Sequence, residues 1–243
     1  MSEQKTVVLT GASRGIGHAT VKRFSREGWR VLTCSRQPFD PRCPWPGGEA
    51  NHIEIDLADP NMTIAAIETI KAKVDGKVHA LVNNAGISPK GPGGKRLNTL
   101  DTDLRTWGHV FHVNFFASVI LARGLKDELA AAKGSIVNVT SIAGSRVHPF
   151  AGAAYSTSKA ALAALTREMA HDFGPLGVRV NAIAPGEVET SILSPGTEKI
   201  VEKLPMQRLG QPSEVADVIW FLCSDQSSYI SGAEIEVNGA QHV

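Results

Sequence analysis

The run Thr6–Thr10 and the glycine-rich turn that follows it constrain the fold most strongly. The run is apolar and rich in β-branched residues, as in a buried parallel strand. The turn at residues 11–17 reads Gly-x-x-x-Gly-x-Gly and leads into a helical pattern from His18 to Arg26. A strand, a glycine turn and a helix in this order predict a dinucleotide-binding unit, the alternative being a plain strand–helix corner. Glycines let a ligand approach the backbone closely, and the start of a helix attracts phosphate.

The rest of the chain alternates between strand-like and helical patterns. Strand-like runs occur at residues 29–35, 52–55, 80–82, 135–140, 179–183 and 234–237. Helical patterns occur at residues 61–74, 104–131, 155–173 and 210–223, the last with Ser213 as its expected N-cap. Alternation without repeats or an internal linker predicts an α/β fold. We expect a single doubly wound, Rossmann-type domain over residues 1–243, with a mostly parallel sheet of about seven strands.

Two segments depart from this alternation. Residues 37–50 contain prolines 38, 41, 44 and 46 and a pair of glycines, a density that excludes a regular helix. We predict an irregular loop there, which would be a lid, a contact to a partner subunit or a plain surface connection. Residues 87–100 are also rich in glycine and proline and predict a flexible loop over the strand ends.

Composition limits the kinds of partner and the compartment. The formal net charge is +1, which gives no reason to expect nucleic acid or an anionic membrane as partner. No apolar run of about eighteen residues is present, and the first residues show no signal-peptide pattern. The three cysteines are odd in number and lack metal-ligand spacing, so we expect neither a disulfide framework nor a metal site. These features predict a cytoplasmic protein.

Tyr155 and Lys159 lie four residues apart in a helical pattern, so their side chains are expected to share a face. A neighbouring cation favours the phenolate, and Lys159 is therefore expected to lower the pKa of Tyr155 from about 10 toward neutrality. Such a phenol can donate or accept a proton near neutral pH, as general acid–base catalysis requires. The alternative is a surface tyrosine and lysine that share a face by chance.

The second strand-like run ends without a carboxylate and is followed by Arg36. At this point in dinucleotide sites an acidic residue binds the ribose 2′-hydroxyl of NAD, whereas an arginine accommodates the 2′-phosphate of NADP. Arg14, in the glycine turn, adds a second positive charge. NADP(H) is therefore favoured, with NAD(H) as the other option, unless both arginines are merely solvated surface residues.

These features occur in order with Asn83-Asn84-Ala85-Gly86 after the fourth strand, with Asn114 and Ser141, and with residues 185–190. Together they resemble the single-domain type of the short-chain dehydrogenase/reductase superfamily, and are similar to its 3-oxoacyl-carrier-protein reductases. The resemblance covers essentially the whole chain. It departs from the usual pattern in the proline-rich segment 37–50, which replaces a helix, and in a long loop after Gly86.

The resemblance implies a role for each matching residue. The catalytic residues would be Asn114, Ser141, Tyr155 and Lys159, with Tyr155 as acid or base, Ser141 on the substrate oxygen and Asn114 holding a water of a proton relay. The cofactor-binding residues would be Gly11, Ser13, Arg14, Ile16, Gly17, Arg36, Asp56, Leu57, Asn83, Ala85, Gly86, Tyr155, Lys159, Pro185, Gly186, Val188 and Thr190. The substrate pocket would contain Ser88, Ser141, Arg146, His148, Phe150, Tyr155 and Leu193.

The implied function is hydride transfer between NADPH and a carbonyl or secondary alcohol, with Tyr155 as the acid or base. The mixed character of the pocket favours a small polar carbonyl. The alternatives are an NAD-dependent polyol or sugar alcohol dehydrogenase, a non-catalytic dinucleotide-binding protein, and an isomerase or dehydratase that uses transient redox chemistry. Family members use the helices that contain Asn114 and Tyr155 to dimerise and the C-terminal tail to complete a tetramer, so the resemblance implies a homotetramer.

Overall fold

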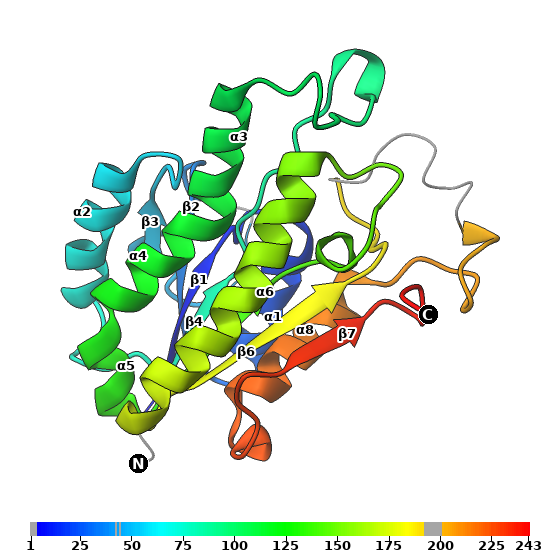
Figure 1. Ribbon diagram of the computed structural model, residues 1–243. Helices are drawn as coiled ribbons and strands as arrows, with labels where there is room; N and C mark the ends of the chain where they lie inside the picture. Colours follow the sequence, from blue (N-terminus) through cyan, green and yellow to red (C-terminus); the bar gives the residue numbers. More distant parts are fainter. Residues whose placement is uncertain (1–3, 42, 44, 192–200) are drawn as a thin grey trace.

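The computed structural model describes residues 4–41, 43, 45–191 and 201–243. Seven parallel strands form one twisted sheet in the order β3-β2-β1-β4-β5-β6-β7 (Figure 1). The strands are β1 (Thr6–Thr10), β2 (Arg30–Ser35), β3 (His52–Glu54), β4 (Ala80–Asn83), β5 (Ser135–Val139), β6 (Arg179–Pro185) and β7 (Glu234–Val237). The prediction of a single Rossmann-type domain is confirmed, and the sheet is parallel throughout. The strand order reverses between β1 and β4, where open α/β sheets bind ligands.

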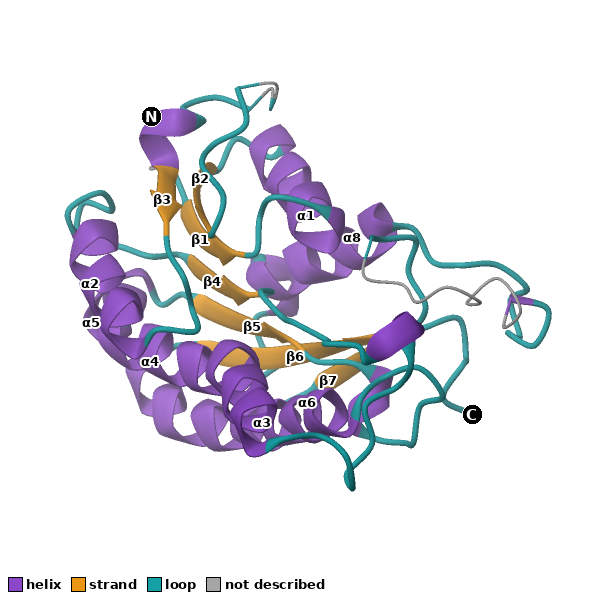
Figure 2. Cartoon of the chain, turned by 90° about the horizontal axis from the view of Figure 1, so that it is seen from above, coloured by secondary structure: helices purple, strands orange, loops and turns teal. Residues whose placement is uncertain are grey.

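Helices cover both faces of the sheet, as Figure 2 shows. One face carries α1 (Gly15–Arg26) and α8 (Pro212–Cys223). The other carries α2 (Pro60–Lys71), α3 (Leu104–Phe111), α4 (Ala117–Gly124), α5 (Lys126–Ala132) and α6 (Ala153–Phe173). Each face has its own apolar core, because strands that are buried on both sides present apolar residues to both layers. No helix of the described residues is long and apolar enough to cross a membrane.

The helical pattern at residues 104–131 forms three helices instead of one. A π-helical turn, His112–Phe116, separates α3 from α4, and Leu125 adopts a non-helical conformation before α5. Single π-helical turns within α-helices occur frequently at functional sites. The predicted N-cap of α8 was wrong: Gln211 caps the helix, since Pro212 suits the first helical position. The Glu214 carboxylate accepts the backbone N–H of Gln211 at 2.7 Å.

The described residues of the proline-rich segment form no helix beyond a single 3₁₀ turn at Glu49–Asn51, as predicted. It is nevertheless more than a surface connection. Trp45 is only 9% exposed and belongs to the core on the α1 side, where its ring meets His18 and Phe39 edge-on at 5.2 and 5.9 Å between centroids. Aromatic packing therefore takes over the covering role that a helix has elsewhere in the sheet.

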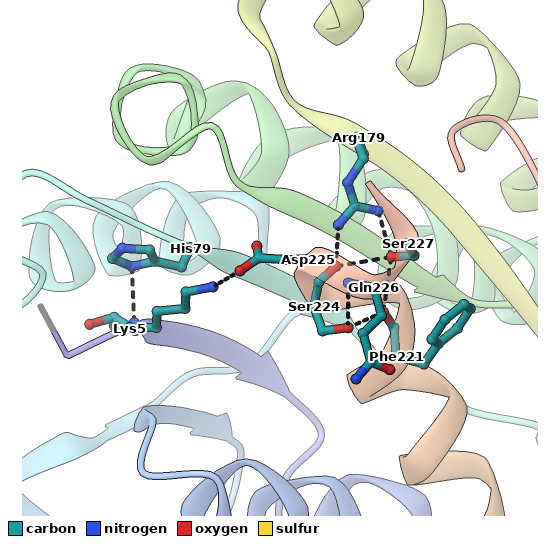
Figure 3. Close-up of polar contacts among 9 residues, drawn as sticks. Lys5, His79, Arg179, Phe221, Ser224, Asp225, Gln226 and Ser227 are labelled. Carbon is teal, nitrogen blue, oxygen red and sulfur yellow. Dashed lines mark hydrogen bonds and ion pairs between the residues drawn. The ribbon is translucent and has the colours of Figure 1, made fainter. Parts of the chain in front are cut away.

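A cluster of hydrogen bonds joins α8 to the amino ends of the strands (Figure 3). Arg179, the first residue of β6, donates to the Ser227 hydroxyl at 2.9 Å and to the Ser224 carbonyl at 3.1 Å. Lys5, just before β1, pairs with Asp225 at 2.9 Å between Nζ and Oδ2. These contacts fix the short 3₁₀ turn Asp225–Ser227 against the sheet edge that lies opposite the ligand-binding edge.

Candidate active site

A cavity of about 880 Å³ lies at the carboxyl ends of the strands and runs from the proline-rich segment to the start of α6. Most of the residues predicted from the sequence line it. These are Gly11, Ser13, Arg14, Ile16, Gly17, Arg36, Asp56, Leu57, Ala85, Gly86, Ser88, Ser141, His148, Phe150, Tyr155, Lys159, Pro185, Gly186, Val188 and Thr190. Leu193 lies outside the described residues.

The glycine turn forms a cradle that fits a dinucleotide phosphate. A Cβ atom on Gly17 would lie 2.1 Å from the Gly11 carbonyl oxygen, and Gly11 itself has a φ of +68°. Larger residues would therefore push the turn out of place. Helix α1 starts directly behind it, and its N-cap residue, Arg14, leaves the first N–H groups uncapped because a guanidinium has no acceptor atom. Those N–H groups and the positive end of the helix can bind an anion.

Asn84, not Asn83, borders the cavity, which corrects the prediction for Asn83. The Asn83 side chain points into the protein and donates to Asn138 Oδ1 at 2.8 Å. Asn84 instead donates to the carbonyls of Thr10 and Gly11, both at 3.0 Å, and so ties the glycine turn to the end of β4. Side chains alternate along a strand, and the exact end of β4 decides which asparagine faces the ligand.

The Tyr155 and Ser141 side chains meet at the inner end of the cavity. Ser141 follows β5, and its hydroxyl oxygen accepts the N–H of Ala143 at 3.2 Å, which fixes the rotamer. Burial raises the pKa of the Tyr155 phenol, opposed by a hydrogen bond with Ser141, while the nearby carboxylate of Glu187 raises it further. The predicted lowering of the Tyr155 pKa by Lys159 is therefore wrong for this structure.

Lys159 is almost fully buried, with 3% of its surface exposed. Its ammonium group donates to the Val139 carbonyl at 2.6 Å and lies 5.8 Å from the centre of the Tyr155 ring. Burial lowers the pKa of Lys159 to about 8. The pair thus shares a helix face as predicted, but desolvation is the main cause of the pKa shift of each group.

Asn114 lies in the π-helical turn and does not line the cavity. Its amide oxygen accepts the N–H of Ile87 at 2.8 Å, and its nitrogen donates to the Ile87 carbonyl at 3.1 Å and to the Ser158 hydroxyl at 3.0 Å. It therefore clamps the loop after Gly86 to helix α6 next to Lys159. The Asn114 side chain therefore has a structural role, as a buried amide must find hydrogen-bond partners.

The substrate side of the cavity contains charged groups that the sequence prediction missed. Glu187, directly after Gly186, and Lys90, in the loop after β4, both line it beside His148. Arg146 was predicted here but points away: it is exposed and donates to the Gln241 carbonyl. Glu187 lies within the motif at residues 185–190, so its position in the sequence was the one available signal. Lys90 lies in an irregular loop that offered none.

The aromatic and acidic residues of the proline-rich segment form the opposite end of the cavity. Phe39, Asp40 and Trp45 line it together with Arg36. Phe39 also packs against His52, with ring centres 6.0 Å apart. The segment therefore borders the part of the cavity nearest to β2, where the adenosine half of a dinucleotide binds in sheets of this topology.

Residues 11–242 match the family described as enoyl-(acyl carrier protein) reductase. The chain is 60% identical to Protein FixR of Bradyrhizobium diazoefficiens, over 99% of this chain and 88% of that protein. It is 34% identical to a 3-oxoacyl-[acyl-carrier-protein] reductase of Aquifex aeolicus, over 97% of this chain and 96% of that protein. A crystal structure of a Brucella ovis oxidoreductase with a partially ordered NAD is 60% identical, with a TM-score of 0.85 over 97% of this chain and 100% of that chain.

The family match begins at Gly11, directly after β1, and includes β2 to β7 and the Ser141, Tyr155 and Lys159 positions at the carboxyl edge of the sheet. The chain therefore belongs to the short-chain dehydrogenase/reductase superfamily, whose members are NAD(P)-dependent oxidoreductases that act on alcohol and carbonyl groups.

Proposed function

We propose that this protein is an NADP(H)-dependent carbonyl reductase or alcohol dehydrogenase in which Tyr155 is the general acid or base. The convergence of Tyr155, Ser141 and Lys159 in one cavity with the glycine cradle supports this most directly. Without Tyr155 and Lys159, the same cavity would suit a non-catalytic dinucleotide-binding protein equally well. We also infer that residues 1–243 work as one catalytic unit.

The cofactor, when bound, supplies the hydride that adds to the carbonyl carbon. The Ser141 and Tyr155 hydroxyls donate hydrogen bonds to the carbonyl oxygen, which gains negative charge as the hydride arrives. Tyr155 then transfers its proton to this oxygen and becomes a phenolate. The nearby Lys159 ammonium stabilises the phenolate, and it would also hold the ribose hydroxyls of the cofactor. Asn114 keeps the loop after Gly86 against α6 and is therefore a positioning residue. We also propose that Asn114 holds a water molecule of a proton relay behind Lys159.

The preference for NADP(H) rests on Arg36 and Arg14. Both are exposed, both line the cavity, and neither forms an ion pair with another described residue. Two such cations can neutralise a 2′-phosphate. The second candidate is NAD-dependent oxidation of a polyol or sugar alcohol. Asp40 at the same end of the cavity favours it, and so does the related Brucella ovis structure with NAD.

Fluorescence titration of the purified protein with NADPH and with NADH tests this choice. We expect tighter binding of NADPH, and we expect Arg36→Ala to remove about tenfold of that preference because one charged contact is lost. The matched control is Arg167→Ala, since Arg167 is exposed on α6 and does not line the cavity. Tighter binding of NADH would contradict the NADP(H) proposal and leave the Tyr155 chemistry standing.

We also infer a homotetramer that acts in the cytoplasm. Exposed apolar residues on and beside α3 and α4, including Leu104 and Phe116, support assembly through this face. The three free cysteines support a reducing compartment. Size-exclusion chromatography with light scattering tests the assembly, and a monomer at micromolar concentration would contradict it.

A further inference from the structure

Glu187 is a buried carboxylate in the substrate half of the cavity. Its side chain is 8% exposed and lines the cavity together with Tyr155. Its Oε1 atom is completely covered, yet it accepts no hydrogen bond from any residue that the structure describes. Because a ligand cannot reach a covered atom, a ligand donor has to approach the other carboxylate oxygen, Oε2, on the part of the side chain that remains exposed. A carboxylate with so few donors is expensive to bury without such a contact.

The neighbouring imidazole does not fill this role. His148 Nδ1 accepts the backbone N–H groups of Phe150 and Ala151, both at 3.3 Å, which leaves the ring proton on Nε2. Nε2 lies 2.8 Å from Glu187 Oε1, close enough for an ion-pair contact but not aligned for a hydrogen bond. The Nε2–H group of His148 thus remains next to the Glu187 carboxylate as a hydrogen-bond donor at the cavity wall.

Lys90 balances the charge of this carboxylate. Its ammonium group donates to the Phe150 carbonyl at 2.6 Å and interacts electrostatically with Glu187. The local charge is therefore close to zero. A second cation would gain little here, whereas a neutral group that both donates and accepts would satisfy Glu187 and His148 together.

The backbone around these side chains is held from several directions. Arg96 donates to the His148 carbonyl at 3.2 Å. The Glu187 N–H donates to the Gln241 side chain at 3.1 Å, and the Glu187 carbonyl accepts the N–H of Gly210 at 2.9 Å. Glu187 is thus fixed in place, so it can select among substrates without first being ordered.

We propose that Glu187 and His148 recognise a hydroxyl group on the carbon next to the reacting carbonyl, so that the substrate is an α-hydroxy carbonyl compound or, in the reverse direction, a vicinal diol. This inference rests on the proposed reductase function for the site. The hydroxyl donates to Glu187 and accepts from the His148 Nε2–H group. An alkyl substituent at the same place would leave the carboxylate buried without a donor and is disfavoured.

The test compares 1-hydroxypropan-2-one with butan-2-one, which has a methyl group in place of the hydroxyl. Ligand-observed NMR titrations measure the binding of each ketone to the protein saturated with NADP⁺ and, in parallel, with NAD⁺. We expect the hydroxyketone to bind about 10- to 100-fold more tightly, as for a hydrogen bond to a charged group. Glu187→Leu should abolish the difference, and Glu187→Gln, which keeps an acceptor, should retain part of it. Glu189→Leu is the matched control, since Glu189 is exposed and does not line the cavity.

Equal affinities for the two ketones, or binding of neither, would overturn this inference. So would a Glu187→Leu variant that weakens both ketones equally, because that result indicates a structural role. The reductase proposal fails separately. If the hydroxyketone binds through Glu187 but neither ketone causes NADPH or NADH oxidation, the recognition site stands and the reductase function does not.

Discussion

Two polar clusters at opposite edges of the sheet differ in how fully their buried groups are paired. At the amino edge, Arg179 reaches the Ser227 hydroxyl and the carbonyls of Ser224 and Ile230. The Ser224 and Ser227 acceptors belong to the turn that follows α8 (Figure 3). Burial lowers the pKa of Arg179, yet its hydrogen bonds keep the guanidinium in place. Such a cluster has no remaining need for a ligand.

At the carboxyl edge the buried groups are only partly paired. The Lys159 ammonium has three donors, and the described residues accept one hydrogen bond from it, at Val139. Glu187 Oε1 is covered without any hydrogen-bond partner among the described residues. The difference separates a cluster that stabilises the fold from one that is completed by cofactor and substrate.

Tyr155→Phe should produce the largest change. It removes the proton donor, and we expect kcat to fall about a thousandfold because general acid catalysis is lost. The thermal unfolding midpoint should change little, since the ring remains. Activity is measured with whichever ketone proves to be a substrate. The matched control is Tyr229→Phe, the fully exposed second tyrosine of the chain. If kcat survives Tyr155→Phe, the proton comes from another group.

Lys159→Met should change how stability depends on pH. The pKa of Lys159 is about 8 in the folded protein, against an ordinary value of 10.5. Between these pH values the unfolded chain binds more protons, so wild-type stability should rise with pH by about 3 kcal/mol in total. Below pH 8 the full penalty of the buried charge is present, and above 10.5 it is gone.

The measurement is urea unfolding of wild type and Lys159→Met at pH 7.5 to 10.5. The variant should lack the rise that this lysine causes, although other groups titrate equally in both proteins. Parallel stability curves would show that the ammonium group is well solvated in the folded protein.

Arg179→Met should act on stability alone. It leaves two carbonyls and a hydroxyl without their donor, and we expect a loss of about 2 kcal/mol in the free energy of unfolding. Because the cluster lies at the edge opposite the cavity, kcat of the folded variant should stay within about twofold of wild type. Arg123→Met, an exposed arginine on α4, is the control. A large fall in kcat would mean that the two edges are coupled.

The fold could be predicted from the sequence because the alternating strand and helix patterns and the glycine turn all indicate the same Rossmann-type fold. Residues Thr6–Thr10 and the Tyr155–Lys159 spacing have strong local preferences, and their elements formed as predicted. Asn83 and Asn84 show the limit of such reasoning. A shift of one residue at the end of a strand exchanges the two faces, and no local preference fixes that end.

Burial is the second limit. The sequence places Lys159 beside Tyr155, but it does not show how little water reaches either group, so the direction of the Tyr155 pKa shift was predicted wrongly. Glu187 and Lys90 come from loops that are far apart in the sequence, and only the folded structure brings them together, at the cavity. Trp45 likewise enters the core from a segment whose prolines gave no pattern of burial.

Asp225→Asn should have the smallest effect on the free energy of unfolding among the contacts of the amino-edge cluster. The Lys5–Asp225 ion pair belongs to the same cluster as Arg179, but the Asp225 side chain is 92% exposed. Water and salt screen such a pair, so we expect a loss of at most about 0.5 kcal/mol, measured by urea unfolding at low salt. The loss should shrink further when the salt concentration is raised. A loss as large as that for Arg179→Met would show that Asp225 positions the 3₁₀ turn that holds Ser224 and Ser227 in place. Solvent exposure alone would then not distinguish the weak contacts at this edge of the sheet from the strong ones.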